Sequence, residues 1–518
     1  MAAFETPGSY ENSSLGSGSS PFKRKEQGTF GDRTTIRPTK EVQQEMEIEL
    51  RYQWVGPIPV KDFFKEFLRI PNVRGMPNVP KDYFDAVPKG KDLKESDMYD
   101  SVVSTTLKWL PYFEILTIIS PQINLVKDVG LLPGFQIVNT SNSPDANSIW
   151  GKKIKPDMCT YEDGVDISIN RTQLDKDRLP WELKPSSAAE PFSDPPENAL
   201  PEELNTYIFE TDTDAGALTR GQIATYLTEI AARQHRTHAF LVFMTDTNIR
   251  FLRADRTGIV VSRSFNYRTN SRLLVEFLWR FSQISDVARG LDPTVRPASI
   301  EEEELARGKL SEWAPEEFRA VVVLQVPDVE DKRGFREVIA WGSMSDAHSL
   351  AGRATRGWPI YDLKAEKVAF LKDSWRSLLP HLDKESSILK ELTDARVRNV
   401  PKYICGDDIG HTTRTQEFVG KVWKAGPTSE SALITRSHHR LLTDLVGRRI
   451  LKFESSRQLM QAIYDAYLGM LFYFITCLDV VFDQWCSSYR CTYDLWDSSS
   501  GYQCRKHPPF FGRNWYFE

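Results

Sequence analysis

The stretch VAFLKDSWR, which runs from Val368 to Arg376, places a lysine inside a segment that its small and apolar residues predict to be a β-strand. Strand interiors seldom hold an ammonium group without a partner, because taking a charge out of water costs free energy that pairing must restore. Lys372 therefore requires an anionic partner. A nucleotide phosphate is one candidate, and further residues that handle phosphate would then lie elsewhere in the chain.

The segment after this strand offers a carboxylate. A helix is predicted over DKESSILKEL, and Glu385 lies on it 13 residues beyond Lys372, with Glu391 as an alternative. In protein kinases a strand lysine holds the α- and β-phosphates of ATP and pairs with a glutamate of a nearby helix. Gly352 and Gly357 bracket GRATRG before the strand, where a flexible loop over the phosphates would belong. The GxGxxG form is missing, so these residues in this order also fit an α/β protein without a nucleotide site.

The composition is that of a globular protein with more than one domain. The chain has 518 residues, 40% of them hydrophobic, and a formal net charge of −5. It has no overall basic field, so a nucleic-acid partner is not expected. Six cysteines form no CxxC pair, which argues against a disulfide framework or a zinc site. The N-terminus lacks a signal-peptide core, and the apolar run AYLGMLFYFITCL is shorter than the ~20 residues that span a bilayer. We expect an intracellular protein of the cytoplasm or nucleus.

The order of the predicted elements indicates a multidomain α+β protein. A strand at LPWELKPSS, a helix at RGQIATYLTEIAARQ, a buried strand at THAFLVFMTD and a hairpin at IRFLRADRTGIVVSRSF describe a mixed α/β domain. The Pro- and acid-rich segment 185–213 is predicted to be a surface loop. The predicted parts are a disordered segment over 1–40, an N-terminal α/β domain over 41–295, a linker over 296–318, a region of strands and then helices over 319–470, and an atypical tail over 471–518.

Long stretches resemble the fungal-type protein kinase family. They are RGQIATYLTEIAARQHRTHAFLVFM, IRFLRADRTGIVVS, RGLDPTV, LKDSWR and HHRLLTDLVGRRILKFESSRQLMQAIYDA, and they fall between residues 100 and 468. The resemblance implies a kinase-like N-lobe and an incomplete helical C-lobe over 319–470, with ATP and Mg²⁺ as cofactors. It also implies phosphorylation of protein serine or threonine. Lys372, Glu385, Gly352 and Gly357 would then be the ATP-binding residues.

Two kinase motifs are missing from the printed sequence. A catalytic loop of His-Arg-Asp type should follow QAIYDA, with an asparagine five residues after its aspartate, and a metal-binding Asp-Phe-Gly-type motif should come later. The aspartates after Tyr467 stand at 479, 483, 494 and 497 and the asparagine at 514, none in this register. Phosphoryl transfer loses its positioning and charge stabilisation without these groups. We therefore expect an inactive relative with no catalytic residue and a truncated C-lobe, arising from an altered reading frame or an evolved pseudokinase tail.

A second set of residues suggests different chemistry. IKPDMCTYEDG and PWELK contain Asp157, Glu182 and Lys184, in the arrangement of a restriction-endonuclease-like PD-(D/E)xK site. A strand would put Glu182 and Lys184 on one face. Asp157 on the preceding strand could complete a carboxylate pair for Mg²⁺, while Lys184 orients a water. Gln222 and Tyr226, on the next helix, could face the same cleft.

Glu182 and Lys184 also fit a simpler, structural role. Alternating charge on a half-exposed strand accounts for the two residues equally well, so a metal-dependent nuclease-like domain and a non-catalytic scaffold are both alternatives. No histidine is predicted to bind metal. Four of them are instead expected to form hydrogen bonds or face solvent near strand edges, namely His235, His238, His438 and His439.

Overall fold

The structure is a computed structural model that describes residues 39–81, 83–90, 93–107, 130–149, 154–168, 171–313, 319–342, 347–427, 433–447 and 453–469. The chain divides into two compact units. The larger is made of Met1–Ile388 and Tyr403–Val446, and the smaller of Leu389–Lys402 and Gly447–Glu518. Nearly all of the predicted segment 1–40 and all of the predicted tail 471–518 lie outside the described residues.

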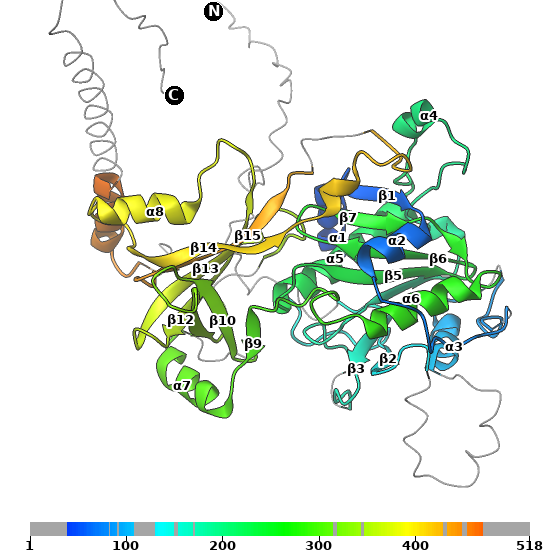
Figure 1. Cartoon of the computed structure of the whole chain (residues 1–518), viewed down its shortest axis with the longest axis horizontal. Coiled ribbons are helices and arrows are strands. Elements are labelled where there is room, and N and C mark those ends of the chain that lie inside the picture. Colours follow the sequence, from blue (N-terminus) through cyan, green and yellow to red (C-terminus); the bar gives the residue numbers. More distant parts are fainter. Residues whose placement is uncertain are drawn as a thin grey trace, which may run out of the picture. The chain divides into compact units, whose positions relative to one another are not determined.

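The first sheet of the larger unit is mixed (Figure 1). Its order is β1-β7-β6-β5-β4-β3-β2, with β8 paired to β6. Strands β2, β3 and β4 are antiparallel neighbours, β4 and β5 are parallel, and β5, β6 and β7 form an antiparallel meander. The strands are β1 (Trp54–Ile58), β2 (Phe135–Asn139), β3 (Met158–Glu162), β4 (Trp181–Lys184), β5 (Ala239–Thr245), β6 (Asn248–Ala254), β7 (Ile259–Ser262) and β8 (Phe265–Asn266).

Helices cover both faces of this sheet. On one face, α2 (Val60–Phe67) and α6 (Ser271–Gln283) bury phenylalanines, and the rings of Phe251 and Phe277 stack at 3.9 Å. On the other face lie α1 (Thr39–Leu50) and α5 (Asp214–Arg233). Val242 and Phe243 are neighbours in β5 and belong to opposite cores, because strand side chains alternate between faces. With α3 (Ser96–Leu107), the chain runs α3-β2-β3-β4-α4-α5-β5 through this domain.

The second sheet is antiparallel throughout, in the order β14-β15-β13-β12-β11-β10-β9. Strand β13, which carries Lys372, lies between β12 and β15, and α8 (Glu385–Asp394) begins shortly after it. Leu371 and its apolar neighbours form the core on the other side of β13 from Lys372. The strands are β9 (Val295–Pro297), β10 (Val322–Pro327), β11 (Phe335–Ala340), β12 (Arg356–Asp362), β13 (Lys367–Ser377), β14 (Tyr403–Thr412) and β15 (Arg436–Thr443).

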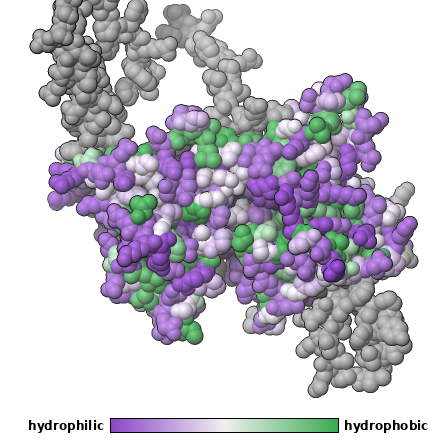
Figure 2. All heavy atoms as spheres, viewed as in Figure 1, coloured by the Kyte–Doolittle hydropathy of each residue, from purple (hydrophilic) through white to green (hydrophobic). Residues whose placement is uncertain are grey.

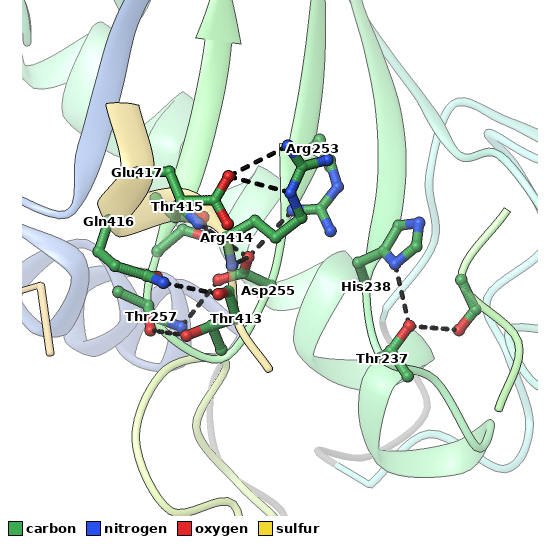
Figure 3. A network of polar contacts seen from close by, with 12 residues as sticks. Thr237, His238, Arg253, Asp255, Thr257, Thr413, Arg414, Thr415, Gln416 and Glu417 are labelled. Atoms are coloured by element: carbon green, nitrogen blue, oxygen red, sulfur yellow. Dashed lines mark hydrogen bonds and ion pairs between the residues drawn. The ribbon is translucent and has the colours of Figure 1, made fainter. Parts of the chain in front are cut away.

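A polar network joins the turn between β6 and β7 to the residues after β14 (Figure 3). Asp255 accepts the backbone N–H of Arg414 at 2.8 Å and pairs with Arg253 at 3.0 Å. The hydroxyl of Thr257 donates to that of Thr413 at 2.8 Å. Because Asp255 and both threonines are buried, these bonds satisfy groups that would be costly to leave unpaired. They connect the two sheets within the larger unit.

Two segments differ from their predicted structure. Residues 296–318, predicted as a linker, contain α7 (Ile300–Leu310), which Ser299 and Glu302 start with a capping box. Apolar periodicity in the sequence did not predict this helix, because it buries little apolar surface. The segment 185–213, predicted as a surface loop, includes η3 (Ser187–Ala189) and α4 (Pro201–Thr206). It also buries Phe192 and Phe209, whose rings stack at 5.0 Å, so the segment is partly core.

The predicted hairpin and helices otherwise occur, with shifted bounds. Strands β6 and β7 form the hairpin, and α5 starts at Asp214, earlier than the predicted residue 220. In the smaller unit a helix covers 456–469, as the four-residue spacing of its apolar side chains predicts. No described helix has the length and apolar character needed to cross a membrane. Hydrophilic side chains dominate the face drawn in Figure 2, and hydrophobic ones are scattered in small groups.

Candidate functional site

Lys372 and Glu385 lie in contact. Lys372 is in the central part of β13, and Glu385 is the first residue of α8. The Nζ atom lies 2.6 Å from Glu385 Oε1 and 2.7 Å from Oε2, so the ammonium donates to both carboxylate oxygens. The two side chains are 29% and 34% exposed. Glu391, the alternative partner, is an exposed residue later on α8. The pair is therefore well formed and partly exposed to solvent.

Gly357 has a different place from the one predicted. It lies inside β12, directly opposite Lys372 in the antiparallel register, and not at the end of a loop. A Cβ atom at this position would come 2.7 Å from the ring of Phe370. Since the backbone of β12 is extended here, the glycine is explained by the space it leaves for that ring. The described loop before the strand is 347–355.

Gly352 and Arg353 lie within this loop, and Arg353 contacts the ion pair. Gly352 has a φ of +103°, which glycine adopts without steric cost, and it donates its N–H to the carbonyl of Arg256 at 2.9 Å. The carbonyl of Arg353 accepts the N–H of Trp375 at 2.7 Å. The guanidinium of Arg353 lies 3.4 Å from Glu385, while its Nε makes no hydrogen bond with the described residues. Two cations thus share one carboxylate.

Asp157, Glu182 and Lys184 also come together, at the edge of the first sheet where β3 begins and β4 ends. Glu182 and Lys184 form an ion pair on the face of β4 that α5 covers. Asp157 immediately precedes β3, and its Oδ2 accepts the N–H of Leu183 at 2.7 Å. These charged groups are almost fully buried, since Glu182 is 1% and Asp157 7% exposed.

Two further side chains belong to this cluster, and neither was expected from the sequence. Glu95, immediately before α3, has Oε1 3.7 Å from Lys184 Nζ. The hydroxyl of Tyr99 lies 2.8 Å from Asp157 Oδ1 and 2.9 Å from Glu95 Oε1. The four-residue spacing of Glu95 and Tyr99 at a helix start was a signal that they share a face. Nothing in the sequence tied that face to Asp157.

Burial and crowded negative charge shift the pKa values of this cluster. Burial, and after it the charge of Glu182, raise the pKa of Asp157 well above its ordinary value. Burial also raises the pKa of Glu182, although Lys184 acts in the opposite direction. Burial opposes the charge on Lys184, but the three carboxylates outweigh it and raise the pKa of the ammonium. Three carboxyl groups, from Asp157, Glu182 and Glu95, therefore surround one ammonium group.

A cavity of about 370 Å³ lies next to this cluster. Gln222 and Tyr226, which were predicted to share a cleft with Asp157, Glu182 and Lys184, both line it together with Lys155. The three charged residues are not among the residues that line it. Tyr226 connects the cavity to the cluster, because the pKa of its hydroxyl is raised by burial and then by the charges of Glu182 and Asp157. The remaining lining residues are Thr39, Gln43, Pro144 and Ile154.

The four histidines form hydrogen bonds in buried surroundings. His438 bonds Asp373, His439 bonds Asp408 at 3.0 Å, and His238 bonds the carbonyl of Ala288 at 2.9 Å. His235 lies 3.5 Å from Arg356. Two groups among the described residues place ligand-type atoms within 4.8 Å of one another, namely Asp292, His411 and His438, and Asp407, Asp408 and His439. Their carboxylates already pair with Arg440, Arg376 and Lys384, so arginine and lysine supply the positive charge there.

The second sheet has the features of one class of protein. A strand lysine held by a glutamate of the following helix, in an antiparallel sheet, is consistent with the α+β fold of protein kinases. A sequence profile described as fungal protein kinase matches residues 207–471, just over half of the chain. The chain belongs to the fungal protein kinase family. No curated protein and no solved structure was found to match it.

Proposed function

We propose that this family member binds ATP beside the Lys372–Glu385 pair. The observation that carries the proposal is the bidentate contact of Lys372 Nζ with Glu385, at 2.6 and 2.7 Å, on β13, an interior strand of the second sheet. In kinases this contact fixes the ammonium where it meets the α- and β-phosphates. The partial exposure of both side chains leaves the ammonium within reach of a ligand.

The charge beside this pair suits a phosphate. Glu385 neutralises one unit of charge, while Lys372 and Arg353 carry two. The side chain of Arg353 is 37% exposed, and although its Nε is buried, its terminal nitrogens can donate further hydrogen bonds. Phosphate oxygens form short, charge-assisted hydrogen bonds with both kinds of cation. Lys372 and Arg353 would therefore hold the phosphates, and Glu385 would position Lys372.

Bound ATP with Mg²⁺ supplies an activated phosphoryl group, and family membership supports proteins as the acceptors. The printed sequence has no aspartate and asparagine in catalytic-loop register after Tyr467. Because transfer depends on positioning the hydroxyl and on the metal-bound carboxylate, we propose that this chain binds nucleotide without transferring phosphate. The protein would then act through the state of its nucleotide site.

A titration of the full chain with the fluorescent analogue TNP-ATP tests the binding. Lys372→Met should weaken binding by about ten- to a hundredfold, since a hydrogen bond to a charged group contributes about 1.5–3 kcal/mol. Lys367→Met is the matched control, because Lys367 is an exposed lysine at the start of the same strand. Equal dissociation constants for the wild type and Lys372→Met would contradict the proposal. Transfer of labelled γ-phosphate to a serine and threonine peptide library would contradict the proposed absence of phosphoryl transfer. It would leave the proposed nucleotide binding intact.

A further inference from the structure

The cluster around Lys184 is not explained by the kinase family. Glu95, Asp157, Glu182 and Lys184 all precede residue 207, where the family match begins. They lie at one edge of the first sheet, whereas the Lys372–Glu385 pair belongs to the second sheet. A role in nucleotide binding by β13 therefore does not account for this cluster.

The cluster is also costly as a purely structural feature. Glu182 is 1% exposed, and its partners are the ammonium of Lys184 and the hydroxyl of Tyr226. Neither carboxylate oxygen accepts a hydrogen bond of ordinary geometry among the described residues. Burying a carboxylate whose hydrogen bonds are incomplete costs more than its ion pair readily returns. Asp157 and Glu95 add negative charge at the same place. A bound cation would offset this cost, because hard divalent ions prefer carboxylate oxygens.

We propose that Asp157 and Glu182 bind a divalent cation, and that this cation and Lys184 together hydrolyse a phosphodiester held in the adjacent cavity. Asp157 accepts hydrogen bonds from Tyr99 and Leu183, which fix its carboxylate and leave lone pairs for a metal. Glu182 has both oxygens available once Lys184 moves away.

The cavity indicates the size and charge of the substrate. Its volume of about 370 Å³ is at the low end of ligand sites, which suits one nucleotide unit with its phosphodiester. Lys155 brings a positive charge to the lining, and Gln222 and Tyr226 bring polar groups. A phosphodiester has one negative charge, which Lys155 would attract while the metal holds a phosphoryl oxygen. The phosphodiester belongs either to a small nucleotide ester or to a nucleic-acid strand.

The reaction consumes one water. The metal-bound water attacks phosphorus, a bond forms between its oxygen and phosphorus, and the bond from phosphorus to the leaving oxygen breaks. Glu95, which is half-buried and reaches solvent, takes the proton of the water and passes it to solvent. A second water protonates the leaving oxygen, so the products are a phosphomonoester and an alcohol. Lys184, as an ammonium, stabilises the negative charge that builds on the phosphoryl oxygens.

Calorimetric titration of the full chain with Mn²⁺, in the absence of nucleotide, tests the metal site. We expect a binding event that Asp157→Asn and Glu182→Gln weaken at least tenfold. Both substitutions keep the shape of the side chain and remove buried charge, so both proteins should fold. Lys184→Met should keep Mn²⁺ binding or tighten it, because the competing ammonium is gone. Glu197→Gln, an exposed carboxylate in the 185–213 segment, is the matched control.

Hydrolysis is measured with two probes in Mn²⁺, thymidine 5′-phosphate p-nitrophenyl ester and a fluorescent single-stranded oligonucleotide. Lys184→Met should lower the rate at least a hundredfold while the metal stays bound, and Lys176→Met, an exposed lysine, should leave the rate unchanged. Cleavage of the ester alone assigns small nucleotide esters, and cleavage of the oligonucleotide assigns a nucleic-acid strand. If Lys184 had only a structural role, Lys184→Met would not lower the rate of hydrolysis while leaving Mn²⁺ binding intact.

Three results would overturn the proposal. They are the absence of Mn²⁺ binding by the wild type, Mn²⁺ binding that Asp157→Asn and Glu182→Gln leave unchanged, and hydrolysis of neither probe by the Mn²⁺-bound wild type. Thermal melting in Mn²⁺ shows whether each variant is folded. If Lys184→Met does not fold, the other two substitutions still decide the metal site and must also abolish hydrolysis.

Discussion

Lys184 and Lys372 each pair with a glutamate, yet their surroundings carry opposite excess charge. Lys184 is 12% exposed and is surrounded by the carboxyl groups of Glu182, Asp157 and Glu95. Lys372 is 29% exposed and shares its single carboxylate with Arg353. An ion pair alone does not indicate a ligand. We propose that the charge left over after pairing does, because it would attract a cation to the first site and a phosphate to the second.

The largest expected contrast is in stability. Lys184→Met should destabilise the metal-free protein by about 3–5 kcal/mol, because removing one partner leaves buried carboxylates uncompensated. Lys372→Met should cost less than about 1 kcal/mol, as expected for an exposed pair. Urea denaturation followed by circular dichroism measures both, and addition of Mn²⁺ should restore most of the loss in Lys184→Met. Equal losses for the two variants would show that burial does not distinguish the pairs.

The pH dependence of stability should have opposite signs in the two domains. The folded-state pKa values of Asp157 and Glu182 are raised, so the folded state binds more protons and stability falls as the pH rises above about 4. Burial opposes ionisation of Asp408, but Arg376 and His439 bring its pKa down to about 2. That contribution is present above about pH 4 and is lost as the pH falls toward 2.

Two substitutions test the two contributions to the pH dependence of stability separately. Asp157→Asn should flatten the fall in stability above about pH 4, while Asp408→Asn should remove the loss between about pH 4 and 2. Denaturation curves at intervals from about pH 2 to 8 check both. An unchanged profile in Asp157→Asn would mean that this carboxyl is not protonated in the folded protein.

Metal binding should release protons. A cation at Asp157 and Glu182 requires the charged forms of both groups, whose pKa values are raised, so the affinity for Mn²⁺ should increase as the pH rises above about 4. Calorimetry in two buffers of different ionisation enthalpy counts the protons released. Mn²⁺ binding that is independent of pH would contradict the raised pKa values.

The smallest effect is expected at Arg353. Arg353→Gln removes the second cation beside Glu385 but leaves the Lys372–Glu385 contact in place. We expect TNP-ATP binding to weaken by about two- to fivefold, equivalent to about 0.5–1 kcal/mol for an exposed charge. Arg333→Gln, at an exposed arginine in the turn before β11, serves as the control. An effect as large as that of Lys372→Met would assign the phosphate contact to Arg353 and not to Lys372.

The sequence indicated the Lys372–Glu385 pair and the shared face of Glu182 and Lys184, because each depends on local spacing. A glutamate two residues before Lys184 on a strand, and a glutamate at the start of the helix after Lys372, follow from the geometry of strands and helices. Glu95 and Arg353 could not be found this way. Their approach depends on how α3 meets β3 and how the 347–355 loop lies against β13, which are tertiary contacts with no local pattern.

The elements of the fold also differed in whether the sequence predicted them. The hairpin of β6 and β7 and the helix α5 follow from apolar periodicity. Helix α7 does not, since its residues bury only Ala306 and Leu310 and its start is set by capping. The burial of Phe192 and Phe209 was not predicted, because the prolines and acidic residues of their segment predict a loop. Composition describes most side chains of such a segment but misses the few that anchor it.

Hydrogen-exchange mass spectrometry of the full chain, with Mn²⁺ alone and with ATP alone, tests the contrast between the two sites most directly. We expect Mn²⁺ to protect residues 155–162 and 181–184 and to leave 353–376 unchanged, and ATP without metal to do the reverse. Protection of both regions by either ligand, or of neither region by both, would contradict the claim that opposite excess charge assigns the two lysines to opposite ligands.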